Sequence, residues 1–369
     1  MFAGRAGIIV VGTSSTTRPP PATEPFFMNR QPTIAVDAMG GDRAPELVIR
    51  GAALACARHP DARMHLVGDP DRIKPLLDRQ KTLRSRCDVV AAGASVEPGE
   101  RPSLALRNKT DSSMALAIGA VKDGTADAAV SAGNTGALMA FAVKLLECLP
   151  GIHRPAIAAT IPTRRSEIVL LDMGANAECE DSHLVQFAVM GTAFARVVLG
   201  RTDPEVRLLN IGQERGKGRA VIRQADAHLR NGPLSENYQG YIEGDGVAAG
   251  EADVVVTDGF TGNVMLKTAE GTAKLCSHYL RTALRSSLGG LMAGILARPT
   301  FQTLREKLDP RKHNGAILLG LNGVTVKSHG GTDALGFAHS IDVAYDMVRG
   351  DVNQHILAAI KEIGEAAPA

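Results

Sequence analysis

The stretch that decides the fold is ADAAVSAGNTGALM, residues 126–139. Residues 128–130 are a short apolar run typical of a buried strand, and a polar, glycine-rich loop and an apolar helix start follow them. The same order returns in ADVVVTDGFTGNVM, residues 252–265, and seven of the fourteen positions are identical. We expect two equivalent helix N-termini, whose free N–H groups and positive dipole ends suit an anion. Convergence on one turn geometry without a shared role is the alternative.

Four further runs along the chain show the same local pattern. Each is a short aliphatic or β-branched run followed by a loop rich in Gly and polar residues; the runs are Thr33–Ala38, Ile168–Leu171, Val206–Leu209 and Val324–Val326. Strands that alternate with helices predict βαβ units and a mostly parallel sheet flanked by helices, an α/β/α sandwich. Loops that leave parallel strands gather at one edge of the sheet, so we expect all six loops to meet there and bind a ligand. The alternative is that they are only tight connections.

Composition excludes several classes of protein. The 41 Lys and Arg residues nearly balance the 39 Asp and Glu residues, and the net charge of +2 argues against a dedicated nucleic-acid binder. Aromatic residues make up 4% of the chain, too few for a base-stacking platform. No run approaches the roughly 18 apolar residues that cross a bilayer. The five cysteines form no CxxC pair and are expected to be reduced thiols of a cytosolic protein.

Common catalytic motifs are missing from the sequence. The first predicted strand is not followed by GxGxxG, and the chain contains no GxxxxGK[ST], GxSxG or HExxH motif. The remaining chemistry falls to anion-binding loops with scattered polar groups. We therefore expect a transfer reaction that involves phosphate and requires no metal or organic cofactor.

Four of these motifs resemble the bacterial phosphate acyltransferase family of phospholipid synthesis. They are Ile34–Asp42, Ser131–Ala137, Asp172–Asn176 and Thr257–Val264, and the resemblance covers about Thr33 to Ile363. It implies transfer of a long-chain acyl group from acyl carrier protein to inorganic phosphate, and a fold similar to phosphate acetyltransferases and isocitrate/isopropylmalate dehydrogenase-like enzymes. It also implies a homodimer, a cytoplasmic enzyme peripherally associated with the inner face of the cell membrane, and an acyl-phosphate-using glycerol-3-phosphate acyltransferase as the next enzyme.

The sequence departs from the family pattern in one loop and at its N-terminus. The family usually has Lys-Lys-Asn-Ser-Ser where this chain has Asn108-Lys109-Thr110-Asp111-Ser112-Ser113, so one basic group is lost and an acidic one is added. The family loop Gly-x-Glu-x-x-Lys-Gly survives in Gly212–Gly218, and Lys217 is retained. Residues 1–31 have no family counterpart, and their Pro- and Ser/Thr-rich sequence predicts a disordered extension.

We expect Lys217, Asn263 and Asn134 to be the catalytic residues. Lys217 is a mobile cation in a glycine-flanked loop that can hold phosphate as the nucleophile, and the resemblance points to the same residue. The two asparagines can donate hydrogen bonds to phosphate or to the oxyanion; capping of the following helices is the alternative. Asp37, Asp172 and Asp258 end strands and are expected to orient neighbouring groups. The expected substrate- and phosphate-binding residues are Gly40, Gly41, Asp42, Ser131, Gly133, Thr135, Gly136, Asn176, Gly259, Thr261, Gly262 and His329.

Residues 275–312 are expected to form a projecting helical hairpin between two parts of the catalytic core, residues 32–274 and 313–364. Seven basic and two acidic residues give the hairpin a net charge of +5, and its middle, residues 288–297, is apolar and uncharged. A basic stem with an apolar tip suits an anionic membrane surface or an acidic carrier protein, whereas burial in the dimer is the alternative. The expected contact residues are Arg281, Arg285, Leu288, Leu291, Met292, Ile295, Leu296 and Arg298.

Two other functions remain open at this point. The first is a short-chain phosphate acetyl- or butyryltransferase that uses coenzyme A, and the second is a non-catalytic scaffold for acyl carrier protein at the membrane. Carrier dependence distinguishes the first from the long-chain enzyme, and a turnover assay distinguishes the second.

Overall fold

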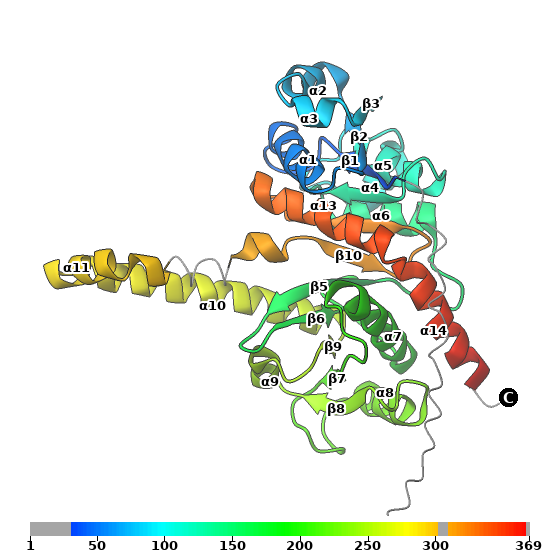
Figure 1. Ribbon diagram of the computed structural model, residues 1–369. Helices are drawn as coiled ribbons and strands as arrows, with labels where there is room; N and C mark the ends of the chain where they lie inside the picture. The colour runs from blue at the N-terminus through cyan, green and yellow to red at the C-terminus, as the bar shows by residue number, and fades with distance from the viewer. Residues whose placement is uncertain (1–30, 302–308, 367–369) are drawn as a thin grey trace, which may run out of the picture. The chain divides into compact units, whose positions relative to one another are not determined.

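The computed structural model describes residues 31–301 and 309–366 (Figure 1). Of the predicted extension, only Gln31 is among them, so that prediction lies outside the described residues. All six predicted strands are present. The strands are β1 (Thr33–Asp37), β2 (Arg63–Gly68), β3 (Cys87–Ala91), β4 (Ala128–Ser131), β5 (Ala156–Pro162), β6 (Glu167–Leu171), β7 (Val206–Leu209), β8 (Tyr238–Ile242), β9 (Val254–Val256), β10 (Ala316–Leu319) and β11 (Val324–Lys327).

These strands form one sheet in the order β3-β2-β1-β4-β11-β10-β5-β6-β9-β7-β8. Strands β1, β2, β3, β4 and β11 run parallel to one another, and so do β6, β7, β8 and β9. Three antiparallel pairings, β11 with β10, β10 with β5 and β5 with β6, separate the two parallel sets. An odd number of reversals makes the two sets run in opposite directions.

This reversal makes the prediction of one common loop edge wrong. The loops after β1, β4 and β11 leave in one direction, and the loops after β6, β7 and β9 leave in the other. The register nevertheless brings the C-terminal ends of β11 and β6 to the same level of the sheet. Val326 pairs with Ile317, Ile317 with Ala158, and Ala158 with Leu171. We call residues 38–44, 132–134 and 328–333 the Asp37 loop group, and residues 172–180, 210–219 and 257–258 the Asp172 loop group.

Helices cover both faces of the sheet. They are α1 (Glu46–Arg58), α2 (Pro70–Leu77), α3 (Lys81–Arg84), α4 (Pro102–Asn108), α5 (Ser113–Lys122), α6 (Thr135–Leu146), α7 (Asp181–Val198), α8 (Ala220–Asn231), α9 (Gly244–Ala249), α10 (Gly259–Arg285), α11 (Leu288–Leu296), α13 (Ala334–Arg349) and α14 (Val352–Ala366), with a 3-10 turn at Pro310–His313.

Alternation along the strands explains this two-sided burial. Val169 and Leu171 pack into the core on the side covered by α7, whereas Ile168 and Leu170 pack on the opposite face with residues of α9 and α10. Successive side chains of a strand point to opposite faces, so a strand covered on both sides reads as a continuous apolar run. This arrangement confirms the predicted α/β/α sandwich.

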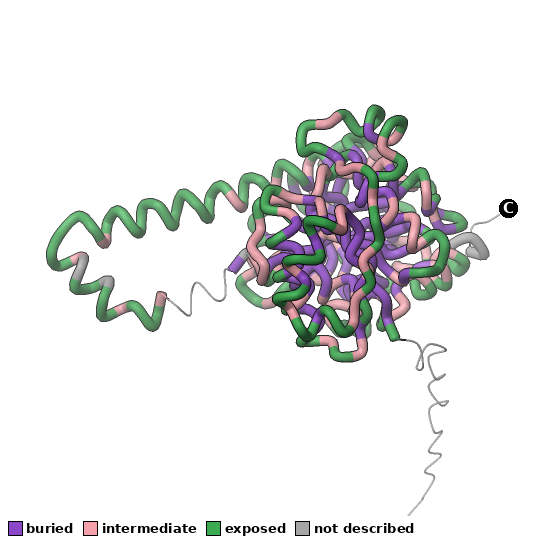
Figure 2. The backbone as a smooth tube through the Cα atoms, turned by 90° about the horizontal axis from the view of Figure 1, so that it is seen from above, coloured by how far each residue is buried: buried purple, intermediate pink, exposed green. Residues whose placement is uncertain are grey.

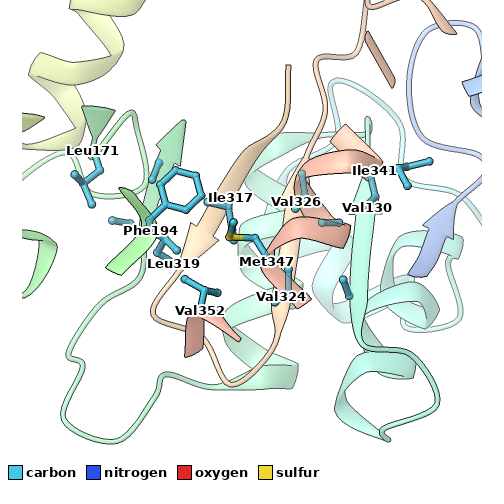
Figure 3. Packing of buried hydrophobic residues seen from close by; sticks show 14 of the residues in the cluster. Val130, Leu171, Phe194, Ile317, Leu319, Val324, Val326, Ile341, Met347 and Val352 are labelled. Carbon is cyan, nitrogen blue, oxygen red and sulfur yellow. The ribbon is translucent and has the colours of Figure 1, made fainter. Parts of the chain in front are cut away.

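The middle of the sheet is the site where the two parallel sets are joined. Figure 3 shows Ile317 and Leu319 of β10 close to Phe194 of α7 and Met347 of α13, with Val352 at the start of α14 nearby. All five side chains are almost completely buried. Each such side chain contributes about 1.5–3 kcal/mol through burial, so the short antiparallel strands are held chiefly by packing.

The predicted hairpin begins inside a longer helix. α10 is continuous from Gly259 to Arg285, so the expected boundary at residue 275 falls in its middle. Beyond the first turns, α10 and α11 are mostly exposed (Figure 2). Leu288, Ile295 and Leu296 are 83%, 66% and 77% exposed. Residues 302–308, which hold part of the expected basic stem, lie outside the described residues, as does the side chain of Leu291.

Candidate active site

Asp37 organises the loops that follow β1 and β4. Its buried carboxylate accepts hydrogen bonds from the hydroxyls of Ser113 and Ser131, both at 2.6 Å, and from the N–H of Met39 at 3.2 Å. Burial raises the pKa of Asp37, although the two serine hydrogen bonds act in the opposite direction. Ser131 was predicted to bind phosphate, but its hydroxyl is engaged by Asp37 and by the N–H of Gly133 at 3.0 Å.

Close backbone approach holds the three loops of the Asp37 loop group together. A Cβ atom on Gly40 would lie 2.5 Å from Asp37 Oδ2 and 2.8 Å from the nitrogen of Gly133. Only glycine fits there. The N–H of Asp42 donates to the carbonyl of Gly330 at 3.2 Å, which joins the β1 loop to the β11 loop. The structure therefore brings together the predicted residues Gly40, Gly41, Asp42, Ser131, Gly133 and His329.

Lys327, the last residue of β11, is a cation that the sequence analysis did not select. Its side chain is partly buried, and its Nζ donates to the carbonyl of Ser328. Burial lowers the pKa of Lys327 to about 8, opposed by the charges of Asp37 and Asp42 and assisted by Lys267. A strand-ending lysine carries no special sequence signal, so only the fold identifies it.

His329, two residues further on, is exposed. Its Nδ1 accepts a hydrogen bond from the N–H of Gly331 at 3.1 Å, which leaves Nε2 as the ring nitrogen available to a substrate. Its own N–H donates to Asn314 Oδ1 at 2.9 Å.

Asp172 plays the matching role in the Asp172 loop group. Its carboxylate is fully buried and accepts five hydrogen bonds. Oδ1 accepts from the N–H groups of Ile157, Gly174 and Ala175 at 3.0–3.1 Å, and Oδ2 accepts from Asn176 N–H at 2.7 Å and Asn176 Nδ2 at 2.9 Å. This carboxylate shapes the β6 loop and has no lone pair directed at a substrate.

The start of α10 packs directly on that loop. The N–H of Gly259 donates to the carbonyl of Asn176 at 2.7 Å. A Cβ atom on Gly262 would lie 1.9 Å from the carbonyl oxygen of Asp172, so this position requires glycine. Asn176 Nδ2 also donates to Pro155 at 2.8 Å. Asn176, Gly259 and Gly262, all predicted to bind phosphate, hold the helix to the sheet through these contacts.

The two similar motifs do not form equivalent helix N-termini, so that prediction is wrong. α6 is capped by Asn134, whose Oδ1 accepts from Ala137 N–H at 3.1 Å, whereas α10 is capped by Asp258, whose Oδ1 accepts from Thr261 N–H at 2.8 Å. In the aligned sequences the cap of α10 comes two residues earlier. Thr261 N–H and Gly259 N–H are bonded within the protein, and Asp258 places a negative charge at the helix end. The first turn of α10 is therefore a poor anion site on its own.

Asn134, predicted to be catalytic, also has its amide group engaged. Its Nδ2 donates to the carbonyls of Pro98 and Glu100, both at 2.9 Å, in addition to the cap at Ala137. These contacts agree with the capping alternative. Thr135 and Gly136 next to it are exposed, and a Cβ atom on Gly136 would meet the ring of Pro102 at 2.7 Å.

Lys217 lies in the exposed loop between β7 and α8. Its carbonyl accepts from Asn210 Nδ2 at 3.2 Å, and Gly218, at a φ of +84°, passes so close to Asn210 that a side chain would collide with it. Two residues on, Arg219 pairs with the buried carboxylate of Asp258. The ion pair holds the Lys217 loop beside the start of α10, where the exposed side chain of Asn263 lies over Gly174.

The first turns of α10 contact the Asp172 loop group and pack near α6, the helix that follows residues 132–134. Met139 of α6 packs in the same hydrophobic cluster as Met265 and Leu266 of α10. The positive charge of Lys267, also on α10, lowers the pKa of Lys327. Asn263 and Lys267 are four residues apart and so share a helix face about 6 Å apart along the axis. α10 thereby links the predicted Asn263 to Lys327.

No cluster of three or more His, Cys, Asp or Glu side chains that could hold a metal ion is present in residues 31–301 and 309–366. None of the helices in these ranges is long and apolar enough to cross a membrane. All five cysteines, which fall within these ranges, are unpaired.

Comparisons with known proteins agree with the resemblance and the fold. The phosphate acyltransferase of Rhodospirillum centenum is 52% identical over 343 residues, which cover 92% of this chain and 97% of that relative. The phosphate acyltransferase of Rhodospirillum rubrum is 50% identical over 336 residues, covering 91% of this chain and 96% of the relative.

Solved structures share the architecture at low sequence identity. A phosphotransacetylase from Streptococcus pyogenes aligns with a TM-score of 0.59 and 17% identity over 86% of this chain and 94% of its own. A branched-chain phosphotransacylase from Enterococcus faecalis aligns with a TM-score of 0.51 and 16% identity over 86% of this chain and 99% of its own. These likenesses confirm the predicted phosphate acetyltransferase-like fold. Residues 32–355 match the model of the family described as fatty acid synthesis protein, and this chain is therefore a member of that family.

Proposed function

We propose that this chain transfers a long-chain fatty acyl group from acyl carrier protein to inorganic phosphate. The product, an acyl phosphate, serves phospholipid synthesis, in which a glycerol-3-phosphate acyltransferase consumes it. The observation that carries the proposal is the 52% identity to a phosphate acyltransferase over nearly the whole of both chains. Acyl carrier protein as donor rests on the resemblance of the four loop motifs.

The chemistry needs a bound phosphate and a stabilised oxyanion. A phosphate oxygen attacks the thioester carbon, a tetrahedral oxyanion forms, and the carbon–sulfur bond breaks to release the thiol of the carrier. Lys217 supplies positive charge to the phosphate, and Arg219, fixed by Asp258, adds to the field at that loop. Asn263 is exposed at the start of α10 and is able to donate a hydrogen bond to phosphate or to the oxyanion.

Other predicted residues support the site through position. Ser131, Asn134 and Asn176 use their side chains inside the protein, so they orient the loops from which the exposed groups project. Replacing them is expected to disturb loop geometry and stability before it disturbs substrate binding.

The first experiment mixes the purified protein with palmitoyl–acyl carrier protein and phosphate and traps acyl phosphate with hydroxylamine. Product that depends on phosphate supports the proposal. Product only from acetyl-coenzyme A would assign the chain to the short-chain enzymes, the alternative that the phosphotransacetylase-like fold keeps open. No product from either donor would favour a scaffold that docks acyl carrier protein.

Substitution of Lys217 tests its role. Lys217→Ala removes a charge from an exposed loop, so we expect an intact fold and a rate lower by about 10²–10³, the usual cost of losing one donor to a developing charge. The measurement is the initial rate against phosphate concentration. Lys122→Ala, an exposed lysine at the end of α5, is the control and should be unchanged. Normal phosphate saturation in Lys217→Ala would remove this residue from the site.

The exposed apolar helix α11 serves as a peripheral membrane contact in this proposal. Leu288, Met292, Ile295 and Leu296 are each more than half exposed, and α11 contains no charged residue. Arg281, Arg285 and Arg298 flank it and suit anionic lipid headgroups.

Ile295→Glu with Leu296→Glu tests this contact by co-sedimentation with anionic vesicles. The expected result is loss of vesicle binding with unchanged activity in solution, because the altered side chains lie outside both loop groups. Leu54→Glu, on the exposed side of α1, is the control. Loss of dimers in sedimentation velocity would instead identify α11 as the subunit contact, and loss of binding to acyl carrier protein would identify it as the carrier contact.

A further inference from the structure

The two loop groups differ in their electrostatic environments. Around Lys217 the exposed charges are Arg215, Arg219 and Arg223 against Glu214, so positive charge prevails there although Arg219 is paired with Asp258. Around Lys327 two carboxylates, Asp37 and Asp42, act against the charges of Lys327 and Lys267. A phosphate dianion is favoured by the first environment and opposed by the carboxylates of the second. Lys327 therefore suits an atom that is neutral in the substrate and becomes negative only during the reaction.

We infer that Lys327 donates the proton that the leaving sulfur takes up when the thioester bond breaks. This inference rests on the proposed acyl transfer. Three structural features support it: the ammonium group is partly buried at the end of a central strand, Lys327 pairs in register with Ser131 of the Asp37 network, and the described contacts give the ammonium group one hydrogen-bond acceptor. The other N–H donors of its ammonium group remain for a substrate.

The proton balance of the reaction closes with this assignment. HPO₄²⁻ attacks the thioester carbon and loses its one proton as it becomes the acyl phosphate dianion. The carbon–sulfur electron pair leaves with sulfur, and Lys327 converts the nascent thiolate to a thiol. The proton lost by phosphate returns the Lys327 amine to ammonium. Because the tetrahedral intermediate can expel either phosphate or thiolate, protonation at sulfur favours the forward direction.

The acidity of Lys327 fits this role. A pKa of about 8 lies near the value of about 8.5 for a thiol, so the proton moves with little uphill cost, and the lysine is still mostly protonated at neutral pH. The charged groups that face it are Asp37 and Asp42 from the β1 side and Lys267 from α10, and His329 lies in its own loop. The two carboxylates keep the amine protonated despite its burial.

The decisive test varies the leaving group. Wild type, Lys327→Met and Lys327→Arg are assayed with palmitoyl–acyl carrier protein and with the thiophenyl ester of palmitate, whose more acidic thiol leaves without protonation. For the carrier substrate we expect kcat/KM to fall about 10²–10⁴-fold in both variants, since arginine keeps the charge but gives up no proton. For the thiophenyl ester we expect less than about a tenfold loss.

A pH profile provides the second readout. In wild type, activity with the carrier substrate should fall as the pH rises through about 8, because the acid must be protonated, and this limb should be absent from the thiophenyl reaction. Lys144→Met, an exposed lysine on α6, controls for loss of a cation, and urea midpoints at pH 7 check that each variant is folded.

The outcomes separate the inference from the proposed function. Equal losses on both thioesters, or full rescue by arginine, would show a purely electrostatic or structural lysine and overturn the inference. A change confined to the KM for phosphate would overturn it as well. Failure of the wild type to form acyl phosphate from either substrate contradicts the proposed function itself.

Discussion

The substitution Asp172→Asn tests whether one buried carboxylate holds the β6 loop and the start of α10 in place. The change is nearly isosteric, but it replaces one oxygen by an NH₂ group. If the amide oxygen keeps the three donors of Oδ1, the NH₂ group faces Asn176 N–H and Asn176 Nδ2, which are donors at 2.7 and 2.9 Å. Each buried donor left without an acceptor costs about 1–3 kcal/mol, so two give a loss of about 2–6 kcal/mol.

The free energy of unfolding is measured by urea denaturation at pH 7, followed by circular dichroism. Asp88→Asn is the matched control, since Asp88 is an exposed strand residue paired with Arg63 and is expected to cost less than about 1 kcal/mol. Acyl phosphate formation should fall as well, because the loop positions Gly174 beneath Asn263. A loss below about 1 kcal/mol for Asp172→Asn would refute the reasoning, because it would mean that the two donors find other acceptors.

Two further predictions concern stability. Gly262→Ala places a Cβ atom 1.9 Å from the Asp172 carbonyl oxygen, so α10 must shift and the free energy of unfolding should fall by at least about 1–3 kcal/mol. At Gly271 on the same helix, an added Cβ atom meets nothing within 4 Å, so Gly271→Ala should stabilise the protein by up to about 1 kcal/mol. If the two variants changed the melting temperature equally, both predictions would be contradicted. The hydrogen bonds from Arg311 lower the pKa of Asp309 to about 2 from 3.8, so its stabilisation is present above pH 3.8 and is lost as the pH falls toward 2. Asp309→Asn should therefore lower the urea midpoint at pH 7 and have the midpoint of the wild type near pH 2. A difference between the two midpoints that does not change with pH would contradict this prediction.

Much of the fold was predictable because local patterns decided it. The apolar runs at residues 128–130, 168–171 and 254–256 became buried central strands, each followed by the expected loop. Five strands, β2, β3, β5, β8 and β10, were not predicted; β10, only four residues long and antiparallel, has no distinctive period. The parallel direction reverses through β10 and β5, and missing both led to the wrong prediction of a single loop edge.

The candidate site was predictable in residue type and less so in role. Lys217 is exposed in the loop where its motif placed it, and Asn263 is exposed but lies in the first turns of α10. Asn134 has the residue type of a donor to phosphate, but its amide is occupied by the carbonyls of Pro98 and Glu100, which come from a loop about 35 residues earlier. Lys327 was passed over because its neighbours Asp37, Asp42 and Lys267 are far away in sequence.

The sequence by itself determined the strand–loop–helix units, the α/β class and the family, because apolar periodicity and glycine-rich turns act over a few residues and are written directly in the chain. The tertiary structure alone decided which polar groups are consumed inside the protein and which face outward. Hydrogen-bond partners such as Asp172 with Ile157, and electrostatic neighbours such as Lys327 with Lys267, meet only when the sheet forms. Burial then lowers the pKa of Lys327 and fixes the geometry of the loops, since both effects depend on the removal of water by distant segments.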